Sequence, residues 1–99
     1  VMGTRSGDLD PGVIVHLIRT EGLTAEEIEE RITRESGMRG VSETSGDVRE
    51  LLSLRDTDPR AAQAIEMFAY SIRKQIGAFA AALGGLDTLV FAGGVGENC

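Results

Sequence analysis

The 99-residue sequence has no tryptophan, one tyrosine, one histidine and one cysteine. A single cysteine excludes a disulfide within the chain and fits a reducing compartment, so we expect a cytoplasmic protein. The one histidine, His16, lies off the main apolar face of its predicted helix, which favours a partly exposed structural role over that of a base. Cys99 is not supported as a nucleophile, because no neighbouring base can be identified.

Basic residues are fewer than acidic ones, with 10 Lys and Arg against 16 Asp and Glu and a net charge of −6. This balance argues against non-specific binding to nucleic acid or to an anionic membrane. Every apolar stretch is too short, or too interrupted by charge, to span a bilayer. No signal-peptide pattern is present, although a chain that begins inside a longer protein would not show one.

The signals that start and stop helices predict four of them within one small domain. Asp10 before Pro11 is an N-cap followed by proline at the first helical position, and Thr24 with Glu27 forms a capping box. Residues 38–44 are expected to be a connector. The helices are expected from Pro11 to near Gly22, from Thr24 to Gly37, from Ser45 or Asp47 through Leu52, and from Asp58-Pro59 to Gly84-Gly85.

Residues 87–92 are predicted to form the only strand. Leu89, Val90 and Phe91 are a short continuous apolar run of the kind found in a buried parallel sheet. The expected fold class is therefore α/β, mostly helical with one strand. Because one strand is not a sheet, its edges need partners, which predicts either an incomplete domain or a homodimer.

A glycine-rich motif, Gly93-Gly94-Val95-Gly96-Glu97-Asn98, follows the predicted strand. Glycines let the backbone adopt positive φ and approach a ligand closely. A helix after such a bend would point its first N–H groups at an anion, but we expect the chain to stop before that helix. Taken alone, the motif is explained more simply by a plain strand-to-helix turn, whereas the strand before it and the Glu97-Asn98 that ends it favour the ligand-binding interpretation.

Arg5 is the only cation among the first eighteen residues and lies between Gly3 and Gly7. Its guanidinium is a planar fork that matches carboxylate or phosphate oxygens bidentately. The alternative, which composition alone favours, is a surface arginine paired with Asp8 or Asp10. Those two carboxylates could also serve Mg²⁺ through water, although a turn residue and an N-cap are the simpler explanation.

The two ends of the chain together resemble the acetate kinase (acetokinase) family. The run Met2-Gly-Thr-Arg-Ser-Gly-Asp-Leu-Asp-Pro-Gly12 is close to a signature of that family, and the glycine-rich motif is close to its adenosine-site loop, GGIGEN. The segment from Phe68 to Phe79 is similar as well, and the resemblance covers nearly the whole chain. It departs at Cys99, where the family usually has serine.

The resemblance implies a fold and a reaction. Residues 1–99 would be part of the C-terminal nucleotide-binding domain, with the ribonuclease H-like fold of the sugar kinase, Hsp70 and actin superfamily. The parent enzyme would use Mg²⁺ and transfer the γ-phosphoryl group of ATP to acetate, giving acetyl phosphate and ADP. The isolated chain should be inactive, because the other catalytic groups of the family precede residue 1.

The resemblance also implies roles for individual residues. Arg5 matches the active-site arginine, which would stabilise the charge of the transferred phosphoryl group. The nucleotide-site segment of the family follows a Gly-Val-Ser stretch like residues 40–42. No residue is assigned to the metal. The residues implied in nucleotide binding are Asp47, Val48, Arg49, Gly93, Gly94, Val95, Gly96 and Glu97.

Three alternatives stay open. A propionate or butyrate kinase would share these motifs, because the residues that select the acyl chain lie outside this segment. Another nucleotide-binding member of the superfamily is possible, although the arginine signature argues against it. The third is a non-catalytic helical interaction module built on a heptad-like stripe: Ile65, Ala69, Ile72, Ile76, Phe79 and Leu83.

Overall fold

Capping residues set the boundaries of the first two helices in the computed structural model, which describes residues 1–98. Helix α1 (Pro11–Glu21) begins after Asp10, whose side chain accepts a hydrogen bond from the Gly12 N–H, and ends at Gly22 with φ 64°. Helix α2 (Ala25–Arg34) begins with the complete Thr24–Glu27 capping box. Both predicted helix starts are confirmed.

The chain between α2 and the next helix differs from the prediction. Helix α2 ends at Arg34, and the expected connector is itself largely helical, forming α3 (Gly37–Ser42). Gly37 adopts φ 62°, which lets the backbone turn sharply and start this new helix. The sequence did not indicate α3 because Ser36, its N-cap, makes no side-chain capping bond.

The remaining helices are α4 (Val48–Leu54), α5 (Pro59–Leu83) and α6 (Gly93–Asn98). Asp47 and Asp58 cap α4 and α5 as predicted, and α5 ends at Gly84 in a left-handed conformation. Helix α6 is a correction, because the glycine-rich motif was expected to be a bend with no helix after it. The motif forms a short helix itself, beginning at Gly93 with φ 73°.

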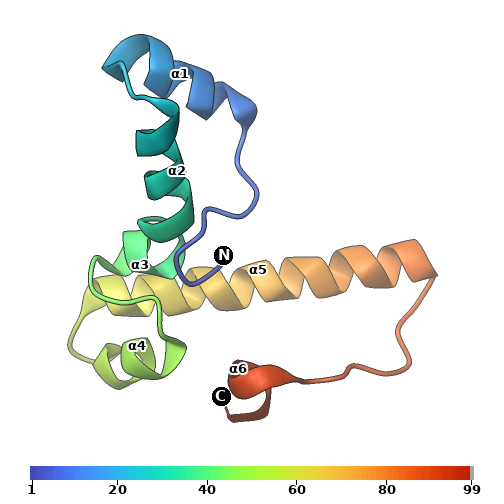
Figure 1. Cartoon of the computed structure of the whole chain (residues 1–99). Helices are drawn as coiled ribbons and strands as arrows, with labels where there is room; N and C mark the ends of the chain where they lie inside the picture. The colour runs from blue at the N-terminus through green and yellow to red at the C-terminus, as the bar shows by residue number, and fades with distance from the viewer. Residues whose placement is uncertain (99) are drawn as a thin grey trace.

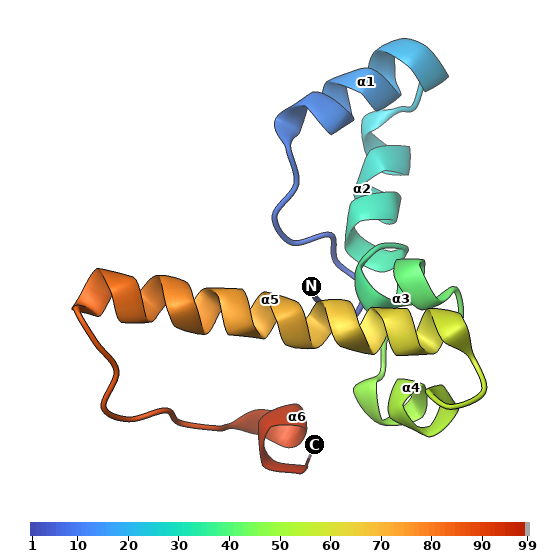
Figure 2. The same ribbon diagram turned by 180° about the vertical axis from the view of Figure 1, so that it is seen from behind.

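The core lies where α3 and α4 pack against the first half of α5. Its buried side chains are Met38, Val48, Leu51, Ala61 and Ala64. Alanines at positions 61 and 64 share one face of α5 and let the neighbouring helices approach closely. Figures 1 and 2 show α1 and α2 on one side of α5, with α4, α6 and the returning C-terminal segment on the other.

The predicted strand at residues 87–92 is wrong, and so is the α/β class for the described part of the chain. Residues 1–98 contain helices, turns and irregular segments and no strand. A strand needs a neighbour to share its ladder of hydrogen bonds, and no described segment pairs with residues 87–92 in this way. Instead the chain turns at Gly84 and Gly85 and runs back along α5 as an extended connection (Figure 1).

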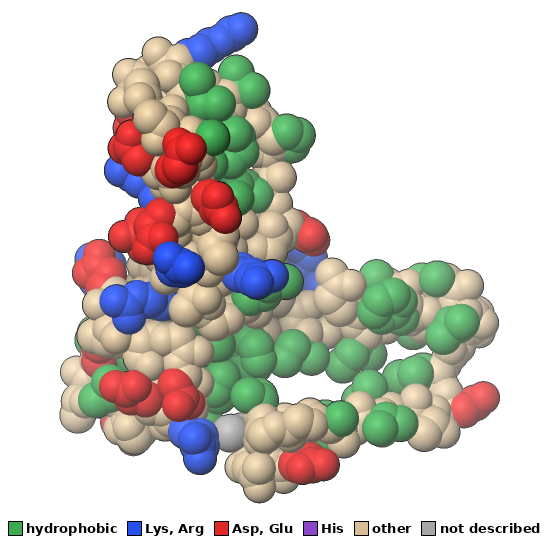
Figure 3. Space-filling view, viewed as in Figure 1, with side chains coloured by type: hydrophobic (Ala, Val, Ile, Leu, Met, Phe, Trp, Pro, Cys, Tyr) green, Lys and Arg blue, Asp and Glu red, His purple; other side chains and the backbone are tan. Residues whose placement is uncertain are grey.

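Apolar side chains gather on the facing sides of α5 and this returning segment (Figure 3). Val90 is 80% exposed and Phe91 67%, so the run that was expected to lie inside a sheet is largely open. The apolar stripe of α5 is likewise exposed in its second half, at Ile72, Phe79 and Leu83. Within residues 1–98 no helix combines the length and the apolar character that crossing a bilayer requires.

Candidate functional site

The segment Asp47-Val48-Arg49 opens α4, and its three side chains have different surroundings. The Asp47 carboxylate accepts a hydrogen bond from the Arg49 N–H at 2.9 Å, and the same oxygen lies 3.9 Å from Arg49 Nε. Val48 is buried in the core and anchors the segment. The side chains of Asp47 and Arg49 are 51% and 80% exposed, so their ion pair contributes little to stability and leaves both groups accessible.

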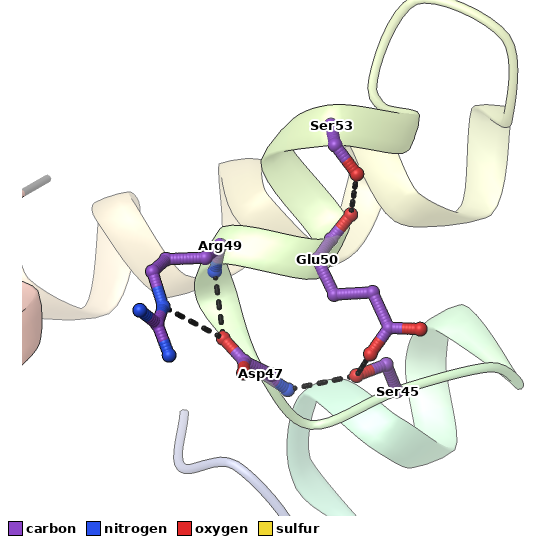
Figure 4. Close-up of polar contacts among 5 residues, drawn as sticks. All are labelled: Ser45, Asp47, Arg49, Glu50 and Ser53. Carbon is purple, nitrogen blue, oxygen red and sulfur yellow. Dashed lines mark hydrogen bonds and ion pairs between the residues drawn. The ribbon is translucent and has the colours of Figure 1, made fainter.

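A network of serine hydroxyls fixes the turn before α4, and Figure 4 shows the part of it made by Ser45. The buried Ser45 hydroxyl accepts a hydrogen bond from the Asp47 N–H at 3.0 Å and donates one to Glu50 Oε2 at 2.8 Å. The Ser42 hydroxyl accepts from the Ser45 N–H at 3.2 Å and donates to the Ser45 carbonyl at 3.0 Å. The backbone that carries Asp47 is therefore held before any ligand arrives.

The sequence pattern assigns no site role to Ser42, and it assigns Ser45 only that of a possible helix cap. Serines that hydrogen-bond nearby backbone N–H groups are a known turn signal, so the repeated serines at 42 and 45 could have indicated this network.

The segment at the start of α4 and the glycine-rich α6 line one pocket of about 300 Å³, although they are separated by more than 40 residues in the sequence. Its lining residues are Asp47, Arg49, Gly94, Val95 and Asn98. A side chain at Gly94 would meet nothing within 4 Å, so the glycine leaves this wall open to a ligand. The pocket is at the small end of the range typical of small-molecule sites.

The other predicted nucleotide residues lie beside this pocket. Val48, Val95 and Gly96 line a neighbouring apolar hollow of about 320 Å³ between α4, α5 and the C-terminal segment. Gly93 starts α6, and Glu97 is exposed on it. The structure thus brings Asp47 and Arg49 together with Gly94 and Val95 in one pocket, and it leaves Val48, Gly93, Gly96 and Glu97 outside that pocket's lining.

The pocket offers both kinds of hydrogen-bonding group. Arg49 carries N–H donors and a permanent positive charge, whereas Asp47 carries acceptor oxygens. Such a pair suits a ligand that has hydroxyl groups as well as acceptor atoms. Across residues 1–98 no group of three or more His, Cys, Asp or Glu side chains is placed to hold a metal ion, so none is assigned to Mg²⁺.

Arg5 lies on a loop that forms backbone hydrogen bonds with α2, with α3 and with the residues between them. The loop donates one hydrogen bond, from the Ser6 N–H to the Ile32 carbonyl at 2.8 Å. It accepts three more, at the carbonyls of Met2, Gly3 and Thr4, from the backbone N–H groups of Met38, Arg39 and Ser36. This backbone pairing holds the loop although it forms no regular element.

The Arg5 side chain is exposed and does not line the pocket. No ion pair found within residues 1–98 involves it, so the expected alternative of pairing with Asp8 or Asp10 is not seen. The Asp10 carboxylate caps α1 instead. His16 contacts Thr20 of its own helix and takes no part in this region.

The polar pocket at the glycine-rich segment and the hydrogen-bonded loop that carries Arg5 are the two features of this region that could contact a ligand. Comparison with known proteins identifies the family of the chain. The model of the acetokinase family matches residues 1–99, and the chain belongs to that family.

Similar proteins include the acetate kinase of Rhodopseudomonas palustris (strain TIE-1), which is 53% identical over 98 residues. The crystal structure of Porphyromonas gingivalis acetate kinase is 53% identical with a TM-score of 0.91, covering 98% of this chain and 25% of that one. A propionate kinase structure from Francisella tularensis is 36% identical with the same TM-score, covering 99% of this chain and 26% of that one. The match covers 99% of this chain and 24% of the Rhodopseudomonas protein, so the chain spans about a quarter of the length of such relatives.

Proposed function

We propose that the chain is the section of an acetate kinase that holds the nucleotide and supplies one catalytic arginine. The full-length enzyme transfers the γ-phosphoryl group of ATP to acetate, giving acetyl phosphate and ADP. The observation that carries the proposal is the shared pocket, where Asp47 and Arg49 from the start of α4 meet Gly94 and Val95 of α6. Two segments that the family resemblance assigns to the nucleotide, far apart in the sequence, thus line one pocket.

Within this pocket the residues have complementary tasks. Arg49 donates hydrogen bonds to acceptor atoms of the nucleotide, and Asp47 accepts them from its hydroxyl groups. Gly94 keeps the wall free of a side chain, so the ligand can approach the backbone. Adenine and ribose fit a site of this kind because they combine a flat apolar surface with a few polar groups.

Arg5 acts at the other end of the substrate. Phosphoryl transfer spreads negative charge over the equatorial oxygens of the transferred group, and a guanidinium stabilises that charge best in the transition state. Arg5 is exposed and makes no ion pair among the described residues, so its side chain is available for such a role. ATP supplies the phosphoryl group and Mg²⁺ its charge neutralisation; within residues 1–98 no group of three or more His, Cys, Asp or Glu side chains is placed to hold a metal ion.

Propionate kinase is the second candidate. The likeness to the Francisella tularensis propionate kinase, 36% identical over almost the whole chain, supports this acceptor less than the 53% identity to acetate kinases supports acetate. The site residues discussed above do not separate the two, because none of them is assigned to the acyl chain.

The experiment is an acceptor comparison with the full-length protein that contains residues 1–99. Acyl phosphate formed from ATP and acetate, propionate or butyrate is trapped with hydroxylamine and measured as the hydroxamate. The proposal predicts the highest kcat/KM with acetate and requires MgATP. A higher kcat/KM with propionate would support the second candidate, and no acyl phosphate with any acceptor would contradict both.

The further expectations from the sequence are proposals of the same kind. We propose a cytoplasmic enzyme, supported by the single cysteine. A homodimer can no longer be argued from strand edges, and its support is the exposed apolar surface at Phe79, Leu83, Val90 and Phe91. Sedimentation of the 99-residue chain tests it, and a strictly monomeric chain at high concentration would contradict it.

A further inference from the structure

Two glycines bring the Arg5 loop and the nucleotide segment into direct backbone contact. Gly3 lies two residues before Arg5, and Gly46 lies directly before Asp47. A Cβ atom on Gly46 would lie 2.8 Å from the Gly3 carbonyl oxygen and 3.2 Å from Thr4 Cγ2. A Cβ atom on Gly3 would lie 3.1 Å from the Gly46 carbonyl oxygen.

The reason for glycine at these positions is close approach and not backbone conformation. Neither Gly3 nor Gly46 is among the residues with positive φ. Alanine at Gly46 would therefore suit the local backbone, but its methyl group would press on the main chain of residue 3. A main chain cannot move aside as the end of a flexible side chain can, so the two segments would have to separate.

Each of the two segments is also held from its other side. The Arg5 loop is fastened by the backbone hydrogen bonds to residues 32–39, and the turn before α4 by the hydroxyls of Ser42 and Ser45. The Gly3–Gly46 contact therefore joins two segments that are each held by their own hydrogen bonds. A substitution there should change the distance between the Arg5 loop and the turn before α4, and should not release either segment.

We infer that Gly46 is a positioning residue which, through its contact with Gly3, sets the distance between Arg5 and the nucleotide segment. This inference rests on the proposed function, because the distance matters only if Arg5 acts on a phosphoryl group whose nucleotide is held at Asp47 and Arg49. Misplacing a catalytic group by about 1 Å can cost on the order of 100-fold in rate. Gly46→Ala should accordingly lower kcat, whereas the KM for ATP changes little because the Ser42 and Ser45 hydroxyls still hold the turn that carries Asp47.

The test is a double-mutant cycle in the full-length protein, with Gly46→Ala, Arg5→Ala and the combined variant. In the wild-type background Gly46→Ala is expected to lower kcat roughly 10- to 100-fold. In the Arg5→Ala background the same change should lower kcat less than about threefold, since a positioning effect disappears with the group that it positions.

Gly22→Ala is the matched control. Gly22 has positive φ, and a Cβ atom added there would meet nothing within 4 Å, so alanine strains the backbone without pressing on another segment. It should lower the melting temperature and leave kcat and the KM for ATP within about twofold, because strain at the end of α1 acts on stability and not on the site. Gly37 is unsuitable as a control, since it has positive φ and a Cβ atom added there would also clash with the carbonyl groups of Met2 and Arg5.

Should Gly46→Ala yield no folded protein, Gly3→Ala gives the same comparison with the milder contact of 3.1 Å. An equal loss of kcat in both backgrounds, or no loss in either, would overturn the positioning role and leave the proposed function intact. An unchanged kcat in Arg5→Ala alone would contradict the catalytic role of Arg5, and the positioning role with it.

Discussion

The carboxylate of Asp47 accepts a hydrogen bond from the backbone N–H of Arg49 at 2.9 Å, so both charged residues of the pocket depend on one helix cap. Asparagine caps a helix about as well as aspartate, whereas alanine does not. Asp47→Ala should lower the free energy of unfolding by about 1 kcal/mol, and Asp47→Asn should leave it nearly unchanged.

The two Asp47 variants separate capping from ligand binding. If Asp47 also accepts a hydrogen bond from the nucleotide, both variants should raise the KM for ATP in the full-length protein. Urea denaturation measures the first effect and steady-state kinetics the second. A KM for ATP that stays at the wild-type value in Asp47→Asn would mean that the residue is a cap only.

Ser45 is expected to matter more than its position before the helix suggests. Its hydroxyl is buried and satisfies both the Asp47 N–H and the Glu50 carboxylate (Figure 4). Ser45→Ala should lower the free energy of unfolding by about 1–3 kcal/mol, because two partly buried hydrogen bonds are lost, one of them to the Glu50 carboxylate. It should also raise the KM for ATP by displacing Asp47.

Ser53→Ala is the control for Ser45→Ala. The Ser53 hydroxyl is exposed and only donates to the Glu50 carbonyl within the same helix, at 2.6 Å. Its loss should change the free energy of unfolding by less than about 0.5 kcal/mol. Equal effects of the two substitutions would contradict a special role for the turn before α4.

The core prediction contrasts two leucines. Leu51 is fully buried between α4 and α5, whereas Leu89 is 45% exposed on the returning segment. In the 99-residue chain Leu51→Ala should cost about 2–5 kcal/mol of stability. Leu89→Ala should cost clearly less, and thermal unfolding followed by circular dichroism measures both. A larger loss for Leu89→Ala would mean that residues 87–92 pack more closely than the structure describes.

Local signals in the sequence predicted the helices well because their causes are local. The caps at Asp10, Thr24, Asp47 and Asp58 act through hydrogen bonds to the next few residues, and each is present in the structure. Helix α3 was missed because its formation depends on Gly37 turning the chain and on Met38 entering the core, neither of which a cap reveals.

Neither the absence of the strand nor the formation of the pocket could be predicted from local sequence patterns. An apolar run such as Leu89-Val90-Phe91 predicts burial, but a strand also requires a neighbour, and no part of residues 1–98 provides one. The motif resemblance pointed to both walls of the pocket. That they line the same pocket, and that Gly3 meets Gly46, depends on contacts between distant segments that no local pattern contains.

The isolated 99-residue chain is expected to form no acyl phosphate above background. Catalysis of phosphoryl transfer is mostly positioning and charge stabilisation, and residues 1–98 offer one candidate arginine and no metal ligand set. Hydroxamate detection with the purified chain, MgATP and acetate measures this. Acyl phosphate formation above background would show that the groups within residues 1–98 suffice for catalysis, and would contradict this prediction.

The most direct test of the central claim is the contrast between Arg5→Ala and Arg49→Ala in the full-length protein. Arg49 lines the pocket with Asp47, so its loss should raise the KM for ATP and change kcat only a few-fold. Arg55→Ala, an exposed arginine at the end of the same helix, should change neither constant.

Arg5 should behave in the opposite way. Its loss should lower kcat on the order of 10²- to 10³-fold with a small change in the KM for ATP, because it stabilises charge that develops in the transition state. Arg5→Lys should recover little, since an ammonium group cannot reproduce the bidentate fork. A kcat for Arg5→Ala within a few-fold of wild type, or a KM for ATP unchanged by Arg49→Ala, would contradict the account.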